Sequence, residues 1–185
     1  MKALVASTTL LLIVDVQERL AAAMPPATLD RLIHNVGVVL EAARILGVSV
    51  LATEQYPKGL GATMASVASR LLPLGVAPIE KMTFDACGEP SVASAIGSRA
   101  PSAIVMAGVE AHVCVFQTAR TLVERGYAVH VLVDAVASRD EANRAAGIAL
   151  CERAGAVSTV TEAVVFDWLE RGGTDAFRAI SKLVR

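Results

Sequence analysis

The chain has 185 residues, a formal net charge of −1 and an apolar fraction of 54%, yet only 4% of its residues are aromatic. This length fits a single domain over residues 1–185 with a sizeable core, and the bias toward Ala, Val, Leu and Ile suits a buried parallel sheet. Basic residues form no block, so neither nucleic acid nor an anionic membrane surface is expected as a partner.

Short apolar runs alternate with helical patterns along the chain. In chain order they predict a strand at 10–14, a helix at 29–46, a strand at 48–53, a loop at 54–61, a strand at 78–82, a helix at 91–98, a strand at 103–109, a helix at 113–125, a strand at 128–133, a helix at 141–154, a strand at 157–161 and two short C-terminal helices. Such alternation implies right-handed βαβ units. We therefore expect an α/β fold, a three-layer αβα sandwich with a Rossmann-like open parallel sheet of about six strands.

Cysteine usage and the opening residues indicate the cellular setting. The three cysteines, Cys87, Cys114 and Cys151, are an odd number without a CxxC spacing, so a reducing cytoplasm is expected. The apolar opening "MKALVASTTLLLIVDVQ" is interpreted as leading into the first strand rather than as a secretory signal, because charges begin at Asp15 where a cleavage region would follow. No run approaches the ~18 apolar residues of a membrane helix.

Three strand ends carry side chains that could take part in catalysis: Asp15, Lys81 and Cys114. Taken singly, each has an ordinary explanation: a turn former, a solvated surface charge and a buried core thiol. Parallel strands bring such ends to one edge of the sheet, where ligands bind. A thiol near a helix N-terminus, a carboxylate to take its proton and an ammonium to stabilise the anion form an activated nucleophile. We expect the pKa of Cys114 to lie below the ~8.5 of a free cysteine.

The remaining candidates point to no metal or cofactor. Cys151 falls among apolar helix residues and is expected in the core, whereas Cys87 follows the third strand and could line the same cleft. The histidines, His34, His112 and His130, form no HxxxH or HxH pair. No GxGxxG or Walker pattern indicates a dinucleotide or ATP. No cofactor is expected.

Four motifs carry a family resemblance that covers nearly the whole chain: "LLIVDVQ", "EKMTF", "GVEAHVCVFQTA" and "GYAVHVLVDAVASR". With them the sequence resembles the isochorismatase-like cysteine hydrolases, a superfamily that includes nicotinamidases and N-carbamoylsarcosine amidohydrolases. The segment "TEQYPKGLG" and the ending "AGAVSTVTEAVVFDWL" are similar to the isochorismatase domain-containing proteins.

The resemblance implies a catalytic triad of Asp15, Lys81 and Cys114, in which Asp15 accepts the thiol proton and Lys81 holds the charge pair. It also places Gln17 and Phe84 near the site, where they would line the substrate pocket.

The resemblance further implies an oxyanion hole made of the backbone N–H groups of Glu110 and Cys114, with a cis peptide bond between Val109 and Glu110. The alternative is a trans turn with Glu110 in solvent and Cys114 packed in the core. Similar proteins assemble, so a homodimer or larger homo-oligomer is expected.

The sequence departs from nicotinamidases in the segment that holds their metal. "TEQYPKGLG" contains no histidine, and Glu54 alone cannot form a site that needs three or four ligands. We therefore expect no metal, and a cysteine hydrolase acting on a small amide, carbamoyl or related C–N substrate through a thioester-type intermediate. Isochorismatase-type vinyl ether hydrolysis and a non-catalytic binding or scaffold role remain the alternatives.

Overall fold

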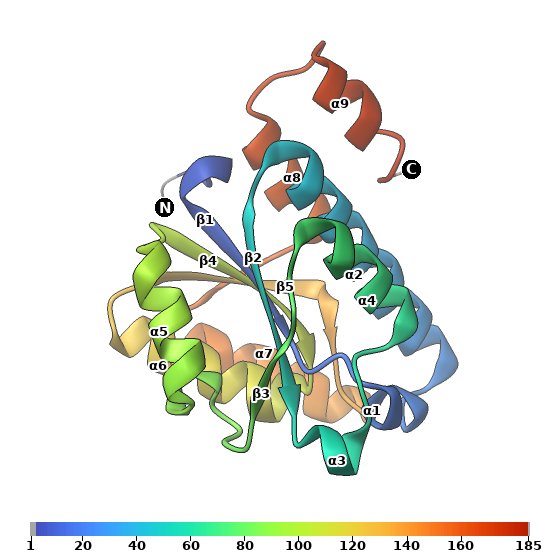
Figure 1. The fold of residues 1–185 in the computed structure, drawn as a ribbon, viewed down its shortest axis with the longest axis vertical. Coiled ribbons are helices and arrows are strands. Elements are labelled where there is room, and N and C mark those ends of the chain that lie inside the picture. Colours follow the sequence, from blue (N-terminus) through green and yellow to red (C-terminus); the bar gives the residue numbers. More distant parts are fainter. Residues whose placement is uncertain (1–2, 185) are drawn as a thin grey trace.

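The chain, in a computed structural model that describes residues 3–184, is built around one parallel sheet (Figure 1). Its strands are β1 (Thr9–Val14), β2 (Ser49–Gln55), β3 (Ile79–Lys81), β4 (Ala103–Val109), β5 (Ala128–Ala137) and β6 (Val157–Thr159). They lie side by side in the order β3-β2-β1-β4-β5-β6, and every neighbouring pair is parallel. The expected α/β fold is confirmed.

Helices connect the strands. The α-helices are α1 (Glu18–Ala22), α2 (Pro26–Leu46), α3 (Pro57–Leu60), α4 (Ala65–Leu71), α5 (Pro90–Arg99), α6 (Phe116–Glu124), α7 (Glu141–Arg153), α8 (Thr161–Leu169) and α9 (Asp175–Ile180). Short 3-10 turns lie at η1 (Ala6–Thr8), η2 (Leu72–Leu74) and η3 (Ala86–Gly88), and a π turn, η4, spans Ala111–Val115. None of the helices within residues 3–184 is both long and apolar enough to cross a membrane.

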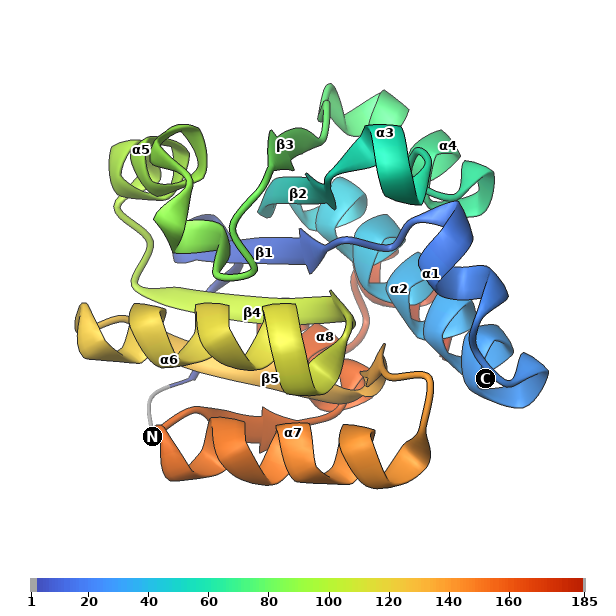
Figure 2. The same ribbon diagram turned by 90° about the horizontal axis from the view of Figure 1, so that it is seen from below.

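Two apolar layers cover the two faces of the sheet. Side chains of β1 alternate between them: Leu11 and Ile13 join the core beneath α2, α4 and α8, whereas Leu10, Leu12 and Val14 join the core beneath α5, α6 and α7. Figure 2 shows the helices on the two sides with the sheet between them. Because strands buried on both faces must be apolar throughout, this packing explains the continuous apolar runs of the sequence.

The predicted elements differ from the structure mainly at their ends. The expected loop 54–61 contains the end of β2 and the short α3, and α1 and α4 were not predicted. β5 continues to Ala137, past its expected end at 133, because a register shift opposite Met106 and Gly108 absorbs extra residues. The expected helix 113–125 begins instead as the π turn, and α6 follows it. Residues 1, 2 and 185 of the expected domain lie outside the described range.

The strand order reverses between β1 and β4, and this is where the two strands approach most closely. Val14 pairs with Gly108 at their carboxyl ends. Gly108 has a φ of 124°, and a Cβ atom placed on it would lie 2.0 Å from the carbonyl oxygen of Val14. Only glycine fits this position, so Gly108 fixes the distance between the segments that carry Asp15 and Cys114.

We predict that Gly108→Ala lowers the free energy of unfolding by at least about 2 kcal/mol, because the new methyl group displaces the end of β1 and the backbone conformation is strained. Gly97→Ala is the matched control: Gly97 lies in α5, and a Cβ atom placed on it would meet no other atom within 4 Å. It should be neutral or stabilising by about 0.5–1 kcal/mol. Urea unfolding of both variants checks this, and equal stabilities would contradict the tight contact.

Candidate active site

A buried ion pair joins the ends of β1 and β3. Lys81 Nζ lies 2.7 Å from Asp15 Oδ2, and both side chains are fully buried. Strand β2 separates β1 from β3 in the sheet, so the long lysine side chain spans one strand to reach the carboxylate. Asp15 has a φ of 50°, in the left-handed region that aspartate tolerates better than most residues. This unusual backbone occurs directly after the strand, at the residue predicted to be catalytic.

Two side chains from β2 complete the surroundings of the ion pair. The hydroxyl of Thr53 donates a 2.7 Å hydrogen bond to Asp15 Oδ1. Lys81 Nζ donates a 2.7 Å hydrogen bond to Gln55 Oε1 and reaches the backbone oxygens of Thr83 and Phe84 at 3.2 and 3.3 Å. Lys81 therefore has several fixed partners, whereas Asp15 Oδ2 has the Lys81 ion pair and forms no hydrogen bond within residues 3–184. Polar partners of this kind allow an ion pair to be buried, since an unpaired buried charge costs several kcal/mol.

Cys114 lies within the π turn beyond β4 and is 6% exposed. Burial raises the pKa of its thiol to about 12, the negative charge of Asp15 contributes to this rise, and Lys81 opposes it. The structure thus brings together all three residues of the expected triad. The expected pKa below 8.5 is wrong for the unliganded protein: Asp15 already neutralises Lys81, so the thiol carries its proton at neutral pH.

The π turn is anchored at Glu110. The backbone oxygen of Glu110 accepts hydrogen bonds from the N–H groups of Val113 and Val115, the second of which spans five residues and defines the π turn. Its carboxylate pairs with Arg139 Nε at 2.9 Å and is 9% exposed. The Val109–Glu110 peptide bond is cis, as expected from the resemblance. The alternative of a trans bond with Glu110 in solvent is wrong.

Helix α7 packs directly on this turn. A Cβ atom on Gly147 would lie 2.5 Å from the carbonyl carbon of Ala111 and 2.5 Å from the nitrogen of His112. The missing side chain lets the α7 backbone contact the backbone of the turn. The His112 Nδ1 atom lies 3.0 Å from the hydroxyl of Ser138, which ties the outer side of the turn to the segment after β5. The loop that carries the nucleophile is thus held from two sides.

The remaining predicted residues have different surroundings. The Gln17 side chain is fully buried, its Nε2 atom donates to the backbone oxygens of Gln55 and Gly61, and its Oε1 atom accepts from the Gln55 N–H. Both polar groups of the Gln17 side chain are therefore hydrogen-bonded inside the protein, where they position the loop after β2. This arrangement leaves neither group free for the expected contact with a substrate. The side chain of Phe84 is 54% exposed beside Lys81, and its place in the pocket wall stays a prediction.

The two other cysteines belong to the apolar core between the sheet and α5–α7. Cys151 is 1% exposed, as expected for a core residue, and Cys87 is 4% exposed. Burial raises the pKa of each thiol to about 11. Neither has the ion pair that accompanies Cys114.

The segment without histidine gives no metal site. The Glu54 carboxylate accepts hydrogen bonds of 2.6 Å from the backbone N–H and the hydroxyl of Thr63. Among residues 3–184, no three His, Cys, Asp or Glu side chains converge in a way that could hold a metal ion.

Sequence reasoning missed Thr53 and Gln55. Both occupy the carboxyl end of β2, next to β1, and in a parallel sheet this position faces the same edge as Asp15. Their polar side chains at the end of an apolar strand were the available signal. The expected end of the second strand at residue 53 left Gln55 in a loop, which concealed it.

The comparisons with known proteins agree with this geometry. A family model described as Isochorismatase domain matches residues 9–163. The chain therefore belongs to the isochorismatase domain family, within the isochorismatase-like hydrolase superfamily.

Three similar proteins cover almost the whole chain. Isochorismatase domain-containing protein 2 of Danio rerio is 33% identical over 177 residues, which is 95% of this chain and 86% of that protein. The secreted isochorismatase effector Isc1 of Phytophthora sojae is 32% identical over 185 residues, 98% of this chain and 87% of that protein. The solved structure of the MAR1 ribonuclease from Caenorhabditis elegans superimposes with a TM-score of 0.91 at 32% identity and covers 99% of this chain and 92% of that chain.

We predict that Asp15→Asn speeds alkylation of Cys114 by iodoacetamide. Removing the carboxylate charge leaves Lys81 free to stabilise the thiolate, so the pKa of Cys114 falls, and alkylation accelerates about tenfold for each unit of pKa. In the unsubstituted protein the rate should still be rising above about pH 9. Iodoacetamide labelling at about pH 8 with peptide mapping measures both.

Cys87 provides the internal control for this experiment. Burial and the charge of Asp85 raise the pKa of its thiol, so its labelling should be the same in both proteins. Equal labelling of Cys114 in the two folded proteins would show that Asp15 does not act on the thiol.

Proposed function

We propose that the protein is a metal-independent cysteine hydrolase that cleaves a small amide, carbamoyl or related C–N substrate. The observation that carries this proposal is the buried Asp15–Lys81 ion pair beside the Cys114 thiol, at the edge of the sheet where strand order reverses. A carboxylate next to a thiol that holds its proton is a general base paired with a nucleophile.

The first half of the proposed reaction forms a thioester. As the sulfur of Cys114 attacks the substrate carbonyl carbon, Asp15 takes the thiol proton and the carbonyl electrons move to the oxygen. The N–H groups of Glu110 and Cys114 hold this oxyanion in the proposal. When the tetrahedral intermediate collapses, the C–N bond breaks and the leaving nitrogen takes the proton from Asp15.

The second half of the proposed reaction releases the acyl group. Asp15 takes a proton from water, the resulting hydroxide attacks the thioester carbon, and the Cys114 sulfur leaves and regains the proton. The sum is amide plus water giving acid plus amine. Lys81 lies 2.7 Å from Asp15 and is held by Gln55, so it stays paired with the carboxylate between turnovers.

The raised pKa of the Cys114 thiol supports a mechanism in which Asp15 takes the proton while the sulfur attacks the substrate. A thiolate formed beforehand would place a second buried negative charge next to Asp15. Proton transfer that accompanies carbon–sulfur bond formation avoids this state, since the negative charge moves onto the substrate oxygen. Two side chains are placed in supporting roles: Thr53 orients the carboxylate, and the exposed Phe84 ring forms part of the substrate pocket.

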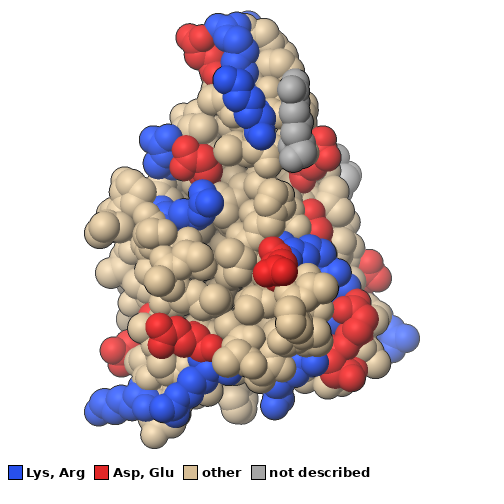
Figure 3. All heavy atoms as spheres, turned by 90° about the vertical axis from the view of Figure 1, so that its right-hand side faces the viewer, with Lys and Arg blue, Asp and Glu red and all other residues tan. Residues whose placement is uncertain are grey.

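Several features weigh against the other functions. Vinyl ether hydrolysis does not require a nucleophilic cysteine, whereas here the thiol lies against a base. A scaffold role gives no reason to bury two charges so completely. RNA is a candidate only because of the name of the Caenorhabditis elegans protein. On the face drawn in Figure 3, acidic and basic side chains are interspersed and most of the surface is uncharged, unlike a phosphate-binding patch.

A substrate screen tests the proposal. Release of ammonia or amine from a library of small amides, ureides and carbamoyl compounds should occur with the protein, fall at least about a thousandfold in Cys114→Ala, and survive prolonged EDTA treatment. Cys87→Ala is the matched control and should keep full activity.

Two results of this screen would contradict the proposal. Loss of activity on chelation with recovery on adding zinc would refute metal independence. Cleavage of an RNA oligonucleotide that depends on Cys114, without amide hydrolysis, would replace the proposed substrate class.

We further propose that the chain forms at least a homodimer. Support comes from large apolar side chains on its surface, including Met82 at 66% and Leu72 at 78% exposure, in a chain of 54% apolar residues. Light scattering at micromolar concentration should give at least twice the mass of one chain, and a monomer would overturn the proposal. The cytoplasmic location stays a prediction.

A further inference from the structure

A cleft lies at the amino-terminal edge of the sheet, opposite the catalytic residues. It consists of two adjoining hollows of about 210 and 560 Å³, and both are walled by Leu4, His130 and Val157. We call it the amino-terminal cleft. Its residues come from the segment before β1, the first residues of β5 and β6, and the inner side of α8. A volume of this size lies within the range of small-molecule sites.

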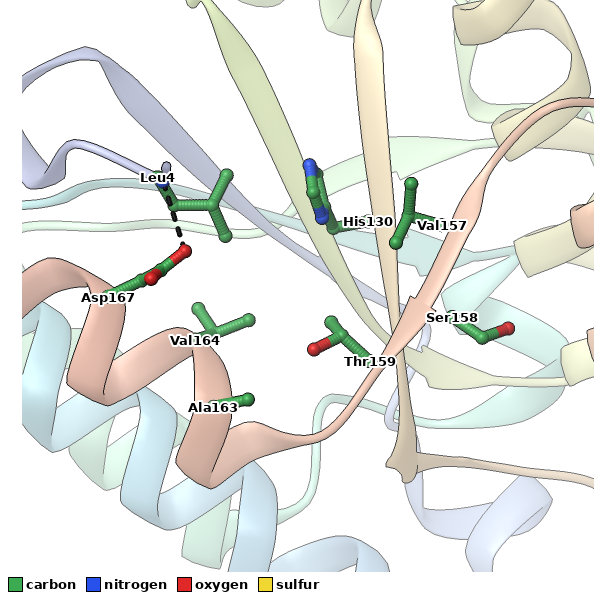
Figure 4. A pocket seen from close by; sticks show the side chains of 8 residues that line it. All are labelled: Leu4, His130, Val157, Ser158, Thr159, Ala163, Val164 and Asp167. Atoms are coloured by element: carbon green, nitrogen blue, oxygen red, sulfur yellow. Dashed lines mark hydrogen bonds between the residues drawn. The ribbon is translucent and has the colours of Figure 1, made fainter. Parts of the chain in front are cut away.

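The His130 side chain lies in the wall of the cleft and forms no hydrogen bond within the described part of the chain. His130 is only 5% exposed, and no hydrogen bond to its ring is formed by residues 3–184. Burial lowers the pKa of His130, so the imidazole is uncharged at neutral pH and keeps one acceptor nitrogen. Figure 4 shows its ring between Leu4 and Val157, facing the space in front of α8. The His130 nitrogens are not among the fully enclosed polar atoms that lack a partner within residues 3–184, so the ring is open to a ligand in the cleft.

A solvent-exposed carboxylate at the rim gives the cleft its charge. Asp167, on α8, accepts a 3.1 Å hydrogen bond from the Leu4 N–H through Oδ2. No lysine or arginine within the described part of the chain forms an ion pair with Asp167. Its negative charge favours a positive charge at the position of His130. Figure 4 also shows the Thr159 hydroxyl directed into the same space.

The remaining wall of the cleft is apolar. Leu4 and Val157 flank His130, and Ala163 and Val164 of α8 line the hollow below Leu4 in the view of Figure 4. A ligand that satisfies this lining combines a hydrocarbon body with one head group that donates hydrogen bonds and carries positive charge. An acid is excluded, because it would place a second negative charge beside Asp167.

We propose that the amino-terminal cleft binds a small apolar amine. The ammonium group is held by the Asp167 carboxylate, with the acceptor nitrogen of His130 as a further partner, and the hydrocarbon part packs between Leu4, Val157 and Val164. Because the site lies at the opposite edge of the sheet from Cys114, it binds its ligand independently of the catalytic thiol.

Paired titrations of the full chain test this site. Benzylamine and its neutral analogue benzyl alcohol are added to ¹⁵N-labelled protein and followed by NMR. Benzylamine should give saturable shifts of the amide signals of Leu4, His130 and Val157. Asp167→Asn, whose amide oxygen can still accept from Leu4, should weaken the affinity at least about tenfold, the effect expected for a lost charge-assisted bond.

Matched variants make the result specific. Glu162→Gln removes a carboxylate from the same helix outside the cleft, and Cys114→Ala alters the catalytic edge; both should leave benzylamine affinity unchanged. Thr159→Val should weaken binding if the hydroxyl contacts the head group, and it provides a second variant should Asp167→Asn fail to fold. Equal binding of benzyl alcohol and benzylamine, equal affinity in all variants, or no saturable shifts at these amides at millimolar ligand would each overturn the proposal.

Discussion

The arrangement of the catalytic edge depends on one buried ion pair. Asp15 and Lys81 are fully enclosed, and desolvating two charges costs several kcal/mol each unless their geometry and hydrogen bonding are nearly complete. The hydrogen bonds of this ion pair come from β2, which lies between β1 and β3: Thr53 bonds to Asp15, and Gln55 bonds to Lys81. The pair therefore forms only when the three strands end in register. The same requirement explains why the ends of apolar strands carry polar side chains. The parallel sheet brings the ends of β1 and β3 to the same edge, where their two charged side chains meet.

The ion pair also decides the state of the nucleophile. An ammonium beside a thiol would by itself favour the thiolate, but the paired carboxylate cancels that charge, and burial keeps the proton on sulfur. The thiol therefore keeps its proton beside a carboxylate that is already paired with Lys81. A thiol in this state is less exposed to oxidation than a preformed thiolate, because oxidation follows thiolate character. Reactivity is then coupled to the arrival of a substrate carbonyl.

The sequence predicted the parallel sheet and the residues that leave it, because both follow from local patterns. Asp15, Lys81 and Cys114 each stand at the end of an apolar run, and the architecture alone brings them to one edge. Thr53, Gln55 and the role of Gln17 could not be predicted in the same way. Their function depends on hydrogen bonds to partners 26 to 44 residues away, which periodicity does not encode. The sequence did not predict the π turn either, because the spacing of its apolar residues is the same as in an α-helix.

The contact between Gly147 and the catalytic turn has a consequence for divergence within the family. Helix α7 contacts the backbone of the turn directly, and this packing holds Cys114 in place. The side chains of Met82 and Phe84 are exposed and lie outside this contact, although the backbone of their loop holds Lys81 and Gln55. Under the proposed function, new substrate preferences arise by substitution of these two exposed side chains, while the loop backbone stays in place. Position 147 is different, because any side chain there would displace the backbone of Ala111 and His112 in the turn that carries Cys114. Engineering libraries aimed at new substrates should therefore vary the loop and leave this glycine fixed.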